Sequence, residues 1–195
     1  MQLLLQEEDT PLNRQLRAEL FRIEQYTEMV LCYFRLDGHS SDFVLKKLRL
    51  DTIIRKSIRK YAPLFIQKKI RLQYDGTDCQ VLTDEKWLLF ILEQLLSNAI
   101  KYTSSGQITI CVDPVKKILS VSDTGIGIAP EDLPRIFERG FTGYNGHENQ
   151  HSTGIGLYLC KKTADKLHHR IWAESSPGVG SCFYLDLASR DLSVE

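Results

Sequence analysis

The sequence lacks clustered cysteines, a long apolar run and net charge. Its 5 cysteines are scattered without a Cys-x-x-Cys pair, which argues against a zinc site and a disulfide framework and indicates a reducing compartment. No apolar run approaches the ~18 residues of a membrane-spanning helix, and the first residues lack a signal-peptide pattern. The formal net charge of +0 gives no electrostatic case for binding nucleic acid or a membrane surface.

What is present is a globular composition over 195 residues, with 43% hydrophobic and 26% charged residues. That length fits one large domain, or one ordinary domain with an appendage. Thr10 and Pro11 form a helix start signal, and apolar residues at spacings of three and four predict a helix to about residue 36. This helix either packs on its own domain or forms one arm of a dimerising hairpin. The polar stretch 37–42 is the best candidate domain boundary.

From residue 43 onward, helical and strand patterns are interspersed. Residues 43–50 are a strand or an extended connector, and Asp51 is expected to cap a helix that bends at Pro63 or continues to residue 67. Asp84 starts a broadly apolar helix that should be largely buried. Further helices are predicted over 130–137 and 154–167, and strands over 70–74, 79–82, 107–112, 118–123, 170–174 and 181–187. This order predicts an α+β fold with helices on one face of a mixed sheet.

The stretch 122–128, Ser-Asp-Thr-Gly-Ile-Gly-Ile, organises the rest of the chain. Asp123 lies where a predicted strand ends, and the glycines that follow let the backbone turn and approach a ligand closely. Residues 153–157, Thr-Gly-Ile-Gly-Leu, open a predicted helix, whose free N–H groups suit an anion. Upstream, Asn98 and Lys101 share one face near the end of a helix. The sequence contains no Walker A loop.

These residue types suit an ATP site. Asp123 can accept a hydrogen bond from the adenine amine, where guanine carries a carbonyl oxygen. Asn98 offers a neutral hard oxygen to Mg²⁺, and Lys101 can reach phosphate. Each residue also has a plain structural interpretation in isolation: Asp123 as a turn former, Asn98 as a helix-terminal residue and Lys101 as a partner of the helix dipole.

Together, in this order and spacing, the motifs resemble the N box, G1 box and G2 box of the histidine-kinase ATP-binding domain, over residues 70–187. Phe137 and Phe141 fall where that family has its F box. The resemblance implies the Bergerat fold, a two-layer α/β sandwich, with ATP and Mg²⁺ as cofactors. It implies catalytic roles for Gln94, Asn98 and Lys101, with Asn98 as the Mg²⁺ ligand. The implied nucleotide-binding residues are Asn98, Lys101, Tyr102, Asp123, Gly125, Ile126, Gly127, Ile128, Phe137, Arg139, Phe141, Thr153, Gly154, Ile155, Gly156 and Leu157.

Residues 138–153 are polar and glycine-containing, which predicts a mobile loop that closes over the phosphates as a lid. Phe137 and Phe141 could anchor this lid by burying aromatic surface, and Arg139 could contact the terminal phosphate. His147 and His151 lie in the same loop. We interpret them as solvent-exposed polar residues rather than as a metal-binding pair.

The residue at position 94 indicates whether the domain hydrolyses ATP or transfers its γ-phosphate. Gyrase-, Hsp90- and MutL-like ATPases of the same superfamily carry a water-activating glutamate there, and glutamine cannot take a proton as a carboxylate can. Glu93 points roughly 100° away around the helix. Strong hydrolysis is therefore not expected. Many histidine kinases have asparagine at this position, so Gln94 is a departure, which looks more like the Firmicute kinases that sense cell-envelope stress or peptide antibiotics.

The resemblance implies a protein histidine kinase that passes the ATP γ-phosphate to its own histidine, or to that of a partner subunit, and then to a response-regulator aspartate. None of the five histidines has the phosphoacceptor context. We therefore interpret residues 1–40 as the remnant of a dimerising hairpin, mostly its second helix, and 41–195 as the catalytic domain. Such a fragment could not autophosphorylate by itself. The parent would be a homodimeric bacterial membrane protein with this domain in the cytoplasm, in contact with neither membrane nor nucleic acid.

Two other function classes stay open from the residues alone. One is an ATPase of the same superfamily or a serine kinase of the anti-sigma type, against which Gln94 and the long first helix both argue. The other is a non-catalytic nucleotide-binding interaction module, which only binding data would separate from a kinase domain.

Overall fold

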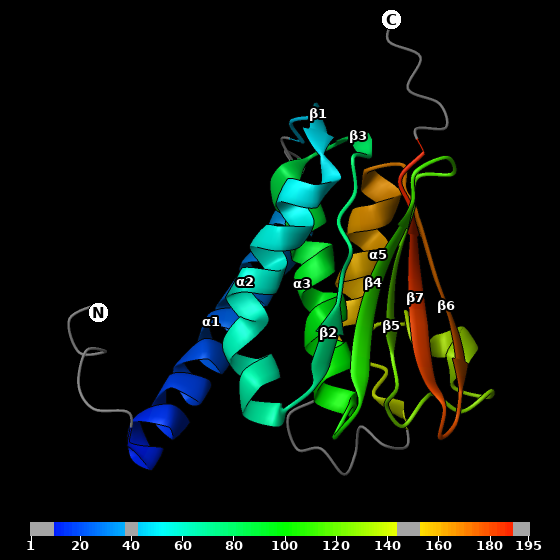
Figure 1. Cartoon of the computed structure of the whole chain (residues 1–195). Coiled ribbons are helices and arrows are strands. Elements are labelled where there is room, and N and C mark those ends of the chain that lie inside the picture. The colour runs from blue at the N-terminus through cyan, green and yellow to red at the C-terminus, as the bar shows by residue number, and fades with distance from the viewer. Residues whose placement is uncertain (1–9, 38–42, 144–152, 189–195) are drawn as a thin grey trace, which may run out of the picture. The chain divides into compact units, whose positions relative to one another are not determined.

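The computed structural model describes residues 10–37, 43–143 and 153–188, and it divides the chain into two compact units, 1–41 and 42–195 (Figure 1). The first unit contains α1 (Pro11–Asp37), a helix of 27 residues. It begins where predicted because the Thr10 hydroxyl accepts a hydrogen bond from the Asn13 N–H at 3.2 Å. The apolar side chains of Leu12 and Leu16 on this helix are 73% and 54% exposed.

The second unit is built on a five-stranded mixed sheet. Its strands follow the order β2 (Arg71–Gln73), β4 (Gln107–Asp113), β5 (Ile118–Asp123), β7 (Gly180–Asp186) and β6 (Arg170–Ser176). β2 pairs with β4 in parallel, and the other neighbouring strands are antiparallel. Residues 43–50 were predicted as a strand or an extended connector. Within them, β1 (Lys46–Arg49) pairs with β3 (Gln80–Thr83) in a separate sheet. The predicted mixed α/β architecture is confirmed.

Three helices cover one face of this sheet: α2 (Leu50–Lys68), α3 (Glu85–Tyr102) and α5 (Gly156–Lys166) (Figure 1). Side chains alternate along each strand, so Ile110, Val121 and Phe183, which are aligned in register, are buried together on one face. α3 packs against both α2 and α5 and is the central helix. It begins as predicted, because the Asp84 carboxylate accepts from two backbone N–H groups of its first turn. None of the helices described in the structure has the length and apolar character to cross a bilayer.

Three local expectations were wrong. Asp51 does not cap α2, which begins one residue earlier, where the Leu50 N–H donates to the Cys79 carbonyl at 3.0 Å. The predicted helix over 130–137 shrinks to the single 3-10 turn η2 (Leu133–Arg135), because Pro134 lacks the N–H that an interior helical position needs. α5 begins at Gly156 rather than at Gly154, whose φ of 65° cannot continue a right-handed helix.

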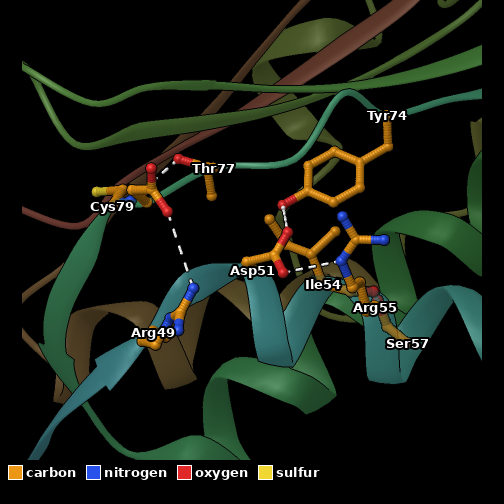
Figure 2. Close-up of polar contacts among 9 residues, drawn as sticks. Arg49, Asp51, Ile54, Arg55, Ser57, Tyr74, Thr77 and Cys79 are labelled. Atoms are coloured by element: carbon orange, nitrogen blue, oxygen red, sulfur yellow. Dashed lines mark hydrogen bonds and ion pairs between the residues drawn. The ribbon is translucent and has the colours of Figure 1, made fainter.

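Asp51 instead ties the start of α2 to the connection between β2 and β3 (Figure 2). Its carboxylate accepts hydrogen bonds from Arg55 Nε at 2.8 Å and from the Tyr74 hydroxyl at 2.9 Å. The Arg55 hydrogen bond is the main cause that holds the pKa of Asp51 below its ordinary value, against the effect of burial. Burial and the Asp51 carboxylate in turn raise the pKa of Tyr74. The two contacts fix the N-terminal end of α2.

A buried histidine joins the two sheets. His169 is 5% exposed and places Nε2 3.0 Å from the Thr83 hydroxyl of β3. Its Nδ1 has no hydrogen-bond partner within the described part of the chain. Burial lowers the pKa of His169 to about 4, although the negative charge of Asp186 opposes that shift. The imidazole is therefore neutral in the folded protein at neutral pH.

We expect the free energy of unfolding to fall as the pH drops from 7 towards 4, and His169→Asn to remove part of that fall. The unfolded histidine titrates near 6.5. Between that value and about 4 the unfolded chain binds a proton that the folded chain does not, which favours unfolding by at most about 3 kcal/mol. Denaturant unfolding at several pH values measures this slope.

The matched control is His168→Asn, since His168 is exposed and has a φ of 56° that asparagine tolerates. This control should keep the pH dependence of the wild type. If His169→Asn and the wild type show the same pH dependence of stability, His169 is not the group responsible for the loss of stability at low pH.

Candidate functional site

The three motifs meet at one end of the five-stranded sheet. β5 ends at Asp123, which lies opposite Ile108 of β4 and Ser181 of β7. Tyr102, the last residue of α3, accepts a hydrogen bond through its carbonyl from the Ile126 N–H at 3.2 Å. Residues far apart in the sequence, on α3, the loop after β5 and the β6–β7 turn, are thus brought side by side.

Asp123 is a buried carboxylate, 8% exposed, at the centre of this arrangement. Its Oδ1 accepts a hydrogen bond from the Gly125 N–H at 2.9 Å, and the backbone N–H of Ser181 also donates to the carboxylate. Burial raises the pKa of Asp123 above its ordinary value, and these two backbone donors oppose the shift. The structure therefore supports a desolvated hydrogen-bond acceptor at the position where the sequence predicts the purine reader.

The loop after β5 depends on its glycines for space as well as conformation. Gly127 has a φ of 72°, and a Cβ there would collide with the carbonyl oxygen of Ser176 in the β6–β7 turn. A Cβ on Gly125 would collide with the carbonyl of Tyr102. Between them, Ile126 is 44% exposed and Ile128 is half-buried. Only a chain without side chains at 125 and 127 can lie this close to both neighbours.

The end of α3 carries the predicted metal and phosphate residues. Asn98 is half-buried, and its side chain has no hydrogen-bond partner among the described residues. Lys101 and Tyr102 are half-buried as well, with Lys101 Nζ 5.2 Å from the centre of the Tyr102 ring. The ammonium of Lys68, at the end of α2, donates to the Ile100 carbonyl at 2.5 Å and so fixes this last turn.

Gln94 and Glu93 point to different neighbours. The Glu93 carboxylate forms an ion pair with Lys60 of α2 at 2.7 Å, and its side chain is 9% exposed. Gln94 instead lies against the start of α5, because a Cβ on Gly156 would come within 2.7 Å of Gln94 Oε1. The carboxylate next to position 94 in the sequence, that of Glu93, is therefore engaged by a helix on the other side of α3.

The glycines before α5 differ in their structural demands. Gly154 has a φ of 65°, and a Cβ there would lie 2.5 Å from the carbonyl carbon of Gly140. The Gly154 carbonyl also accepts a hydrogen bond from the Gly140 N–H at 3.0 Å. No side chain caps α5, which begins after Ile155. The N–H groups of its first turn thus keep their capacity to bind an anion.

The remaining predicted site residues lie before and after the glycines that precede α5, and they differ in how far they are buried. Thr153 and Arg139 are exposed, whereas Ile155 and Leu157 are half-buried. Phe137 and Phe141 are half-buried, and the Arg135 guanidinium lies 4.6 Å from the centre of the Phe141 ring. The predicted lid over 138–153 falls largely on residues 144–152, including His147 and His151, which lie outside the described residues.

Comparisons with known proteins agree with this geometry. Residues 83–191 match the family described as histidine kinase-, DNA gyrase B-, and HSP90-like ATPase. The chain is 41% identical over 182 residues to the sensor protein BceS of Halalkalibacterium halodurans, which covers 91% of this chain and 54% of BceS. It is 37% identical over 184 residues to the sensor histidine kinase YxdK of Bacillus subtilis, covering 92% of this chain and 57% of YxdK. The chain belongs to this ATPase family.

The sensor-kinase resemblance is confirmed by these relatives, although the chain spans little more than half of their length. Among solved structures, the Acinetobacter baumannii histidine kinase AdeS has the same fold with a TM-score of 0.71 at 21% identity, covering 95% of this chain and 87% of AdeS. The catalytic domain of the histidine kinase ThkA has a TM-score of 0.62 at 25% identity, covering 74% of this chain and 95% of ThkA. The fold is thus that of histidine-kinase catalytic domains.

Within this family domain, sequence reasoning missed two serines beside Asp123. The predicted strands over 170–174 and 181–187 leave 177–180 as the turn between them, and neither serine was assigned a role. Ser181 follows that turn, is 9% exposed and lies opposite Asp123 in the sheet. Ser175 precedes the turn and accepts a hydrogen bond from the Ile128 N–H at 2.8 Å. The pairing of serines on either side of a tight Pro-Gly-x-Gly turn was the available signal.

Proposed function

We propose that this ATPase-family domain binds Mg-ATP at the end of β5 and, within a longer sensor histidine kinase, supplies the γ-phosphate to a phosphoacceptor histidine. The observation that carries the proposal is the buried Asp123 carboxylate, held by two backbone N–H groups beside a loop that needs glycine. A desolvated acceptor favours a purine with an exocyclic amine over one with a carbonyl oxygen at that place. Ser181, on the same face of the sheet, is suited to contact the same base.

The residues near α3 and α5 fit the triphosphate and a metal ion. The unpartnered amide of Asn98 provides an oxygen ligand that suits Mg²⁺, which when bound would neutralise charge on the phosphate oxygens. Lys101 and Tyr102 would add an ammonium and a hydroxyl next to the phosphates. The uncapped first turn of α5 would bind phosphate through the N–H groups after Gly154. Phe137, Arg139 and Phe141, at the start of the predicted lid, would border the nucleotide.

Two contacts favour transfer of the phosphoryl group over hydrolysis. Glu93 is bound to Lys60, so it is held away from the start of α5. Gln94 lies against Gly156 and can position that segment, but its amide cannot act as a base for water. Phosphoryl transfer relies mainly on positioning and electrostatic stabilisation, which the present residues supply. The acceptor would be a histidine, and then an aspartate of a response regulator.

The first unit supports a dimeric parent protein. Apolar side chains at helical spacing on α1, among them Leu12, Leu16 and Ile23, are more than half exposed. We infer that residues 1–40 belong to a dimerising hairpin and that 41–195 form the catalytic domain, as expected from the sequence. The parent would place both on the cytoplasmic side of a bacterial membrane.

Asn98→Ala should weaken the binding of ADP by about 10- to 100-fold when Mg²⁺ is present, because the Mg²⁺ ion loses a neutral oxygen ligand. In the presence of EDTA the variant and the wild type should bind ADP with similar affinity. Calorimetric titration under both conditions measures the two ratios. Equal losses with and without Mg²⁺ would contradict the role of Asn98 as a metal ligand.

A further inference from the structure

The β6–β7 turn holds the loop that follows β5. The Gly178 N–H donates to the Ile126 carbonyl at 2.8 Å, and the Ile128 N–H donates to Ser175 Oγ at 2.8 Å. Between these two bonds, Gly127 lies against the carbonyl of Ser176. The turn thus sets the position of residues 126–128. Of these two hydrogen bonds, the first joins backbone groups and the second uses the side chain of Ser175.

The hydrogen bonds of Ser175 leave one consistent arrangement of protons. Its hydroxyl lies 2.8 Å from the Gly180 carbonyl, which can only accept, so Ser175 must donate its single proton there. The Ile128 N–H occupies one lone pair of Ser175. Ser181 Oγ lies 3.0 Å from Ser175 Oγ. Since the proton of Ser175 is already committed, Ser181 must be the donor in this pair.

This arrangement determines what Ser181 can offer to a ligand. Its one proton is directed to Ser175, and its hydroxyl has no other hydrogen-bond partner among the described residues. Only acceptor lone pairs remain. Ser181 lies opposite Asp123, whose ionised carboxylate is also a pure acceptor. Two acceptors side by side favour a ligand group that donates protons.

We propose that Ser175 is a positioning residue for base selectivity. Ser175 accepts the hydrogen bond that the Ser181 hydroxyl donates, so Ser181 can only accept hydrogen bonds from a ligand. The site thereby favours a 6-amino purine over a 6-oxo purine. This inference rests on the proposed function, namely that the purine binds at Asp123. Without the Ser175 hydroxyl, Ser181 can rotate and donate to a 6-oxo group, so discrimination falls although no residue facing the base has changed.

The test compares Mg-ADP with Mg-IDP, two nucleotides with the same ribose and phosphates but a 6-amino or a 6-oxo base. Wild type should prefer ADP, and Ser175→Ala should lower the ratio of the two affinities by about three- to tenfold, the worth of one hydrogen bond. Ser175→Thr, which keeps the hydroxyl, should restore the ratio. The matched control is Ser176→Ala, because Ser176 faces away and contributes only its carbonyl. General loosening of the site would weaken both nucleotides alike and leave the ratio unchanged.

A double-mutant cycle shows whether Ser175 acts through Ser181. In a Ser181→Ala background, Ser175→Ala should no longer change the ratio; if it changes the ratio as much as in wild type, the inference is overturned. Should Ser175→Ala not fold, Ser175→Cys keeps the volume with a weak donor and should lower the ratio in the same direction. An unchanged ratio in Ser175→Ala or Ser175→Cys overturns the role of Ser175 and leaves the purine site intact. Wild type that binds neither nucleotide overturns the proposed function itself.

Discussion

Asp123→Asn should weaken the binding of adenine nucleotides by about 100-fold, the cost of a lost charge-assisted hydrogen bond in a desolvated site. The carboxylate accepts from the backbone N–H groups of Gly125 and Ser181 and still has acceptor capacity for a ligand. An asparagine that turns its oxygen to the backbone would present N–H groups to the adenine amine. Titration with Mg-ADP, followed by calorimetry, measures this loss.

The matched control is Asp113→Asn. The Asp113 carboxylate also accepts from two backbone N–H groups, in the turn between β4 and β5, at the other end of the sheet. This variant should bind nucleotide as the wild type does. Wild-type affinity in Asp123→Asn would contradict the assignment of the purine reader.

The raised pKa of Asp123 adds a pH dependence to the same experiment. A carboxyl that burial makes easier to protonate loses its acceptor character earlier as the pH falls. Affinity for ADP should therefore decrease more steeply with falling pH in wild type than in Asp123→Asn. This comparison separates the titration of Asp123 from any general effect of pH on the fold.

Gly127→Ala should destabilise the protein by about 2–5 kcal/mol and abolish nucleotide binding. Alanine in a left-handed conformation costs about 1–2 kcal/mol, and the added Cβ would meet the carbonyl of Ser176, at a further cost of about 1–3 kcal/mol. Relief of that collision would separate the loop from the β6–β7 turn. Denaturant unfolding measures the first effect, and titration with Mg-ADP the second.

Gly178→Ala isolates the contribution of the collision. Gly178 has a φ of 75°, close to the 72° of Gly127, but a Cβ there meets nothing within 4 Å. Its replacement should cost only the conformational part, about 1–2 kcal/mol, and leave binding intact. If the two alanine variants lose equal stability, close packing of the loop on the turn is not what Gly127 provides.

Local sequence signals predicted the starts of two helices well. Thr10 and Asp84 begin helices because each accepts backbone N–H bonds, a property that spacing in the sequence reveals. The glycines after Asp123 also indicated a backbone that must approach its neighbours. These features depend on residues within a few positions of one another.

The features that sequence reasoning missed depend on contacts between distant segments. Ser181 lies opposite Asp123, and Ser175 opposite Ser181, because β5, β7 and β6 are neighbours in the sheet. Asp51 resembles a helix cap in the sequence, but Arg55 and Tyr74 engage its carboxylate instead. The ion pair of Glu93 likewise required the packing of α3 against α2.

The most direct test of the account is calorimetric titration of the wild-type chain with a non-hydrolysable ATP analogue and Mg²⁺, monitored in parallel by amide NMR. We predict saturable binding at one site, with shifts concentrated at the Gly125, Ile128 and Ser181 amides and at the start of α5. Absence of binding at millimolar analogue, or shifts confined to the β1–β3 end of the unit, would contradict the assignment of the nucleotide site.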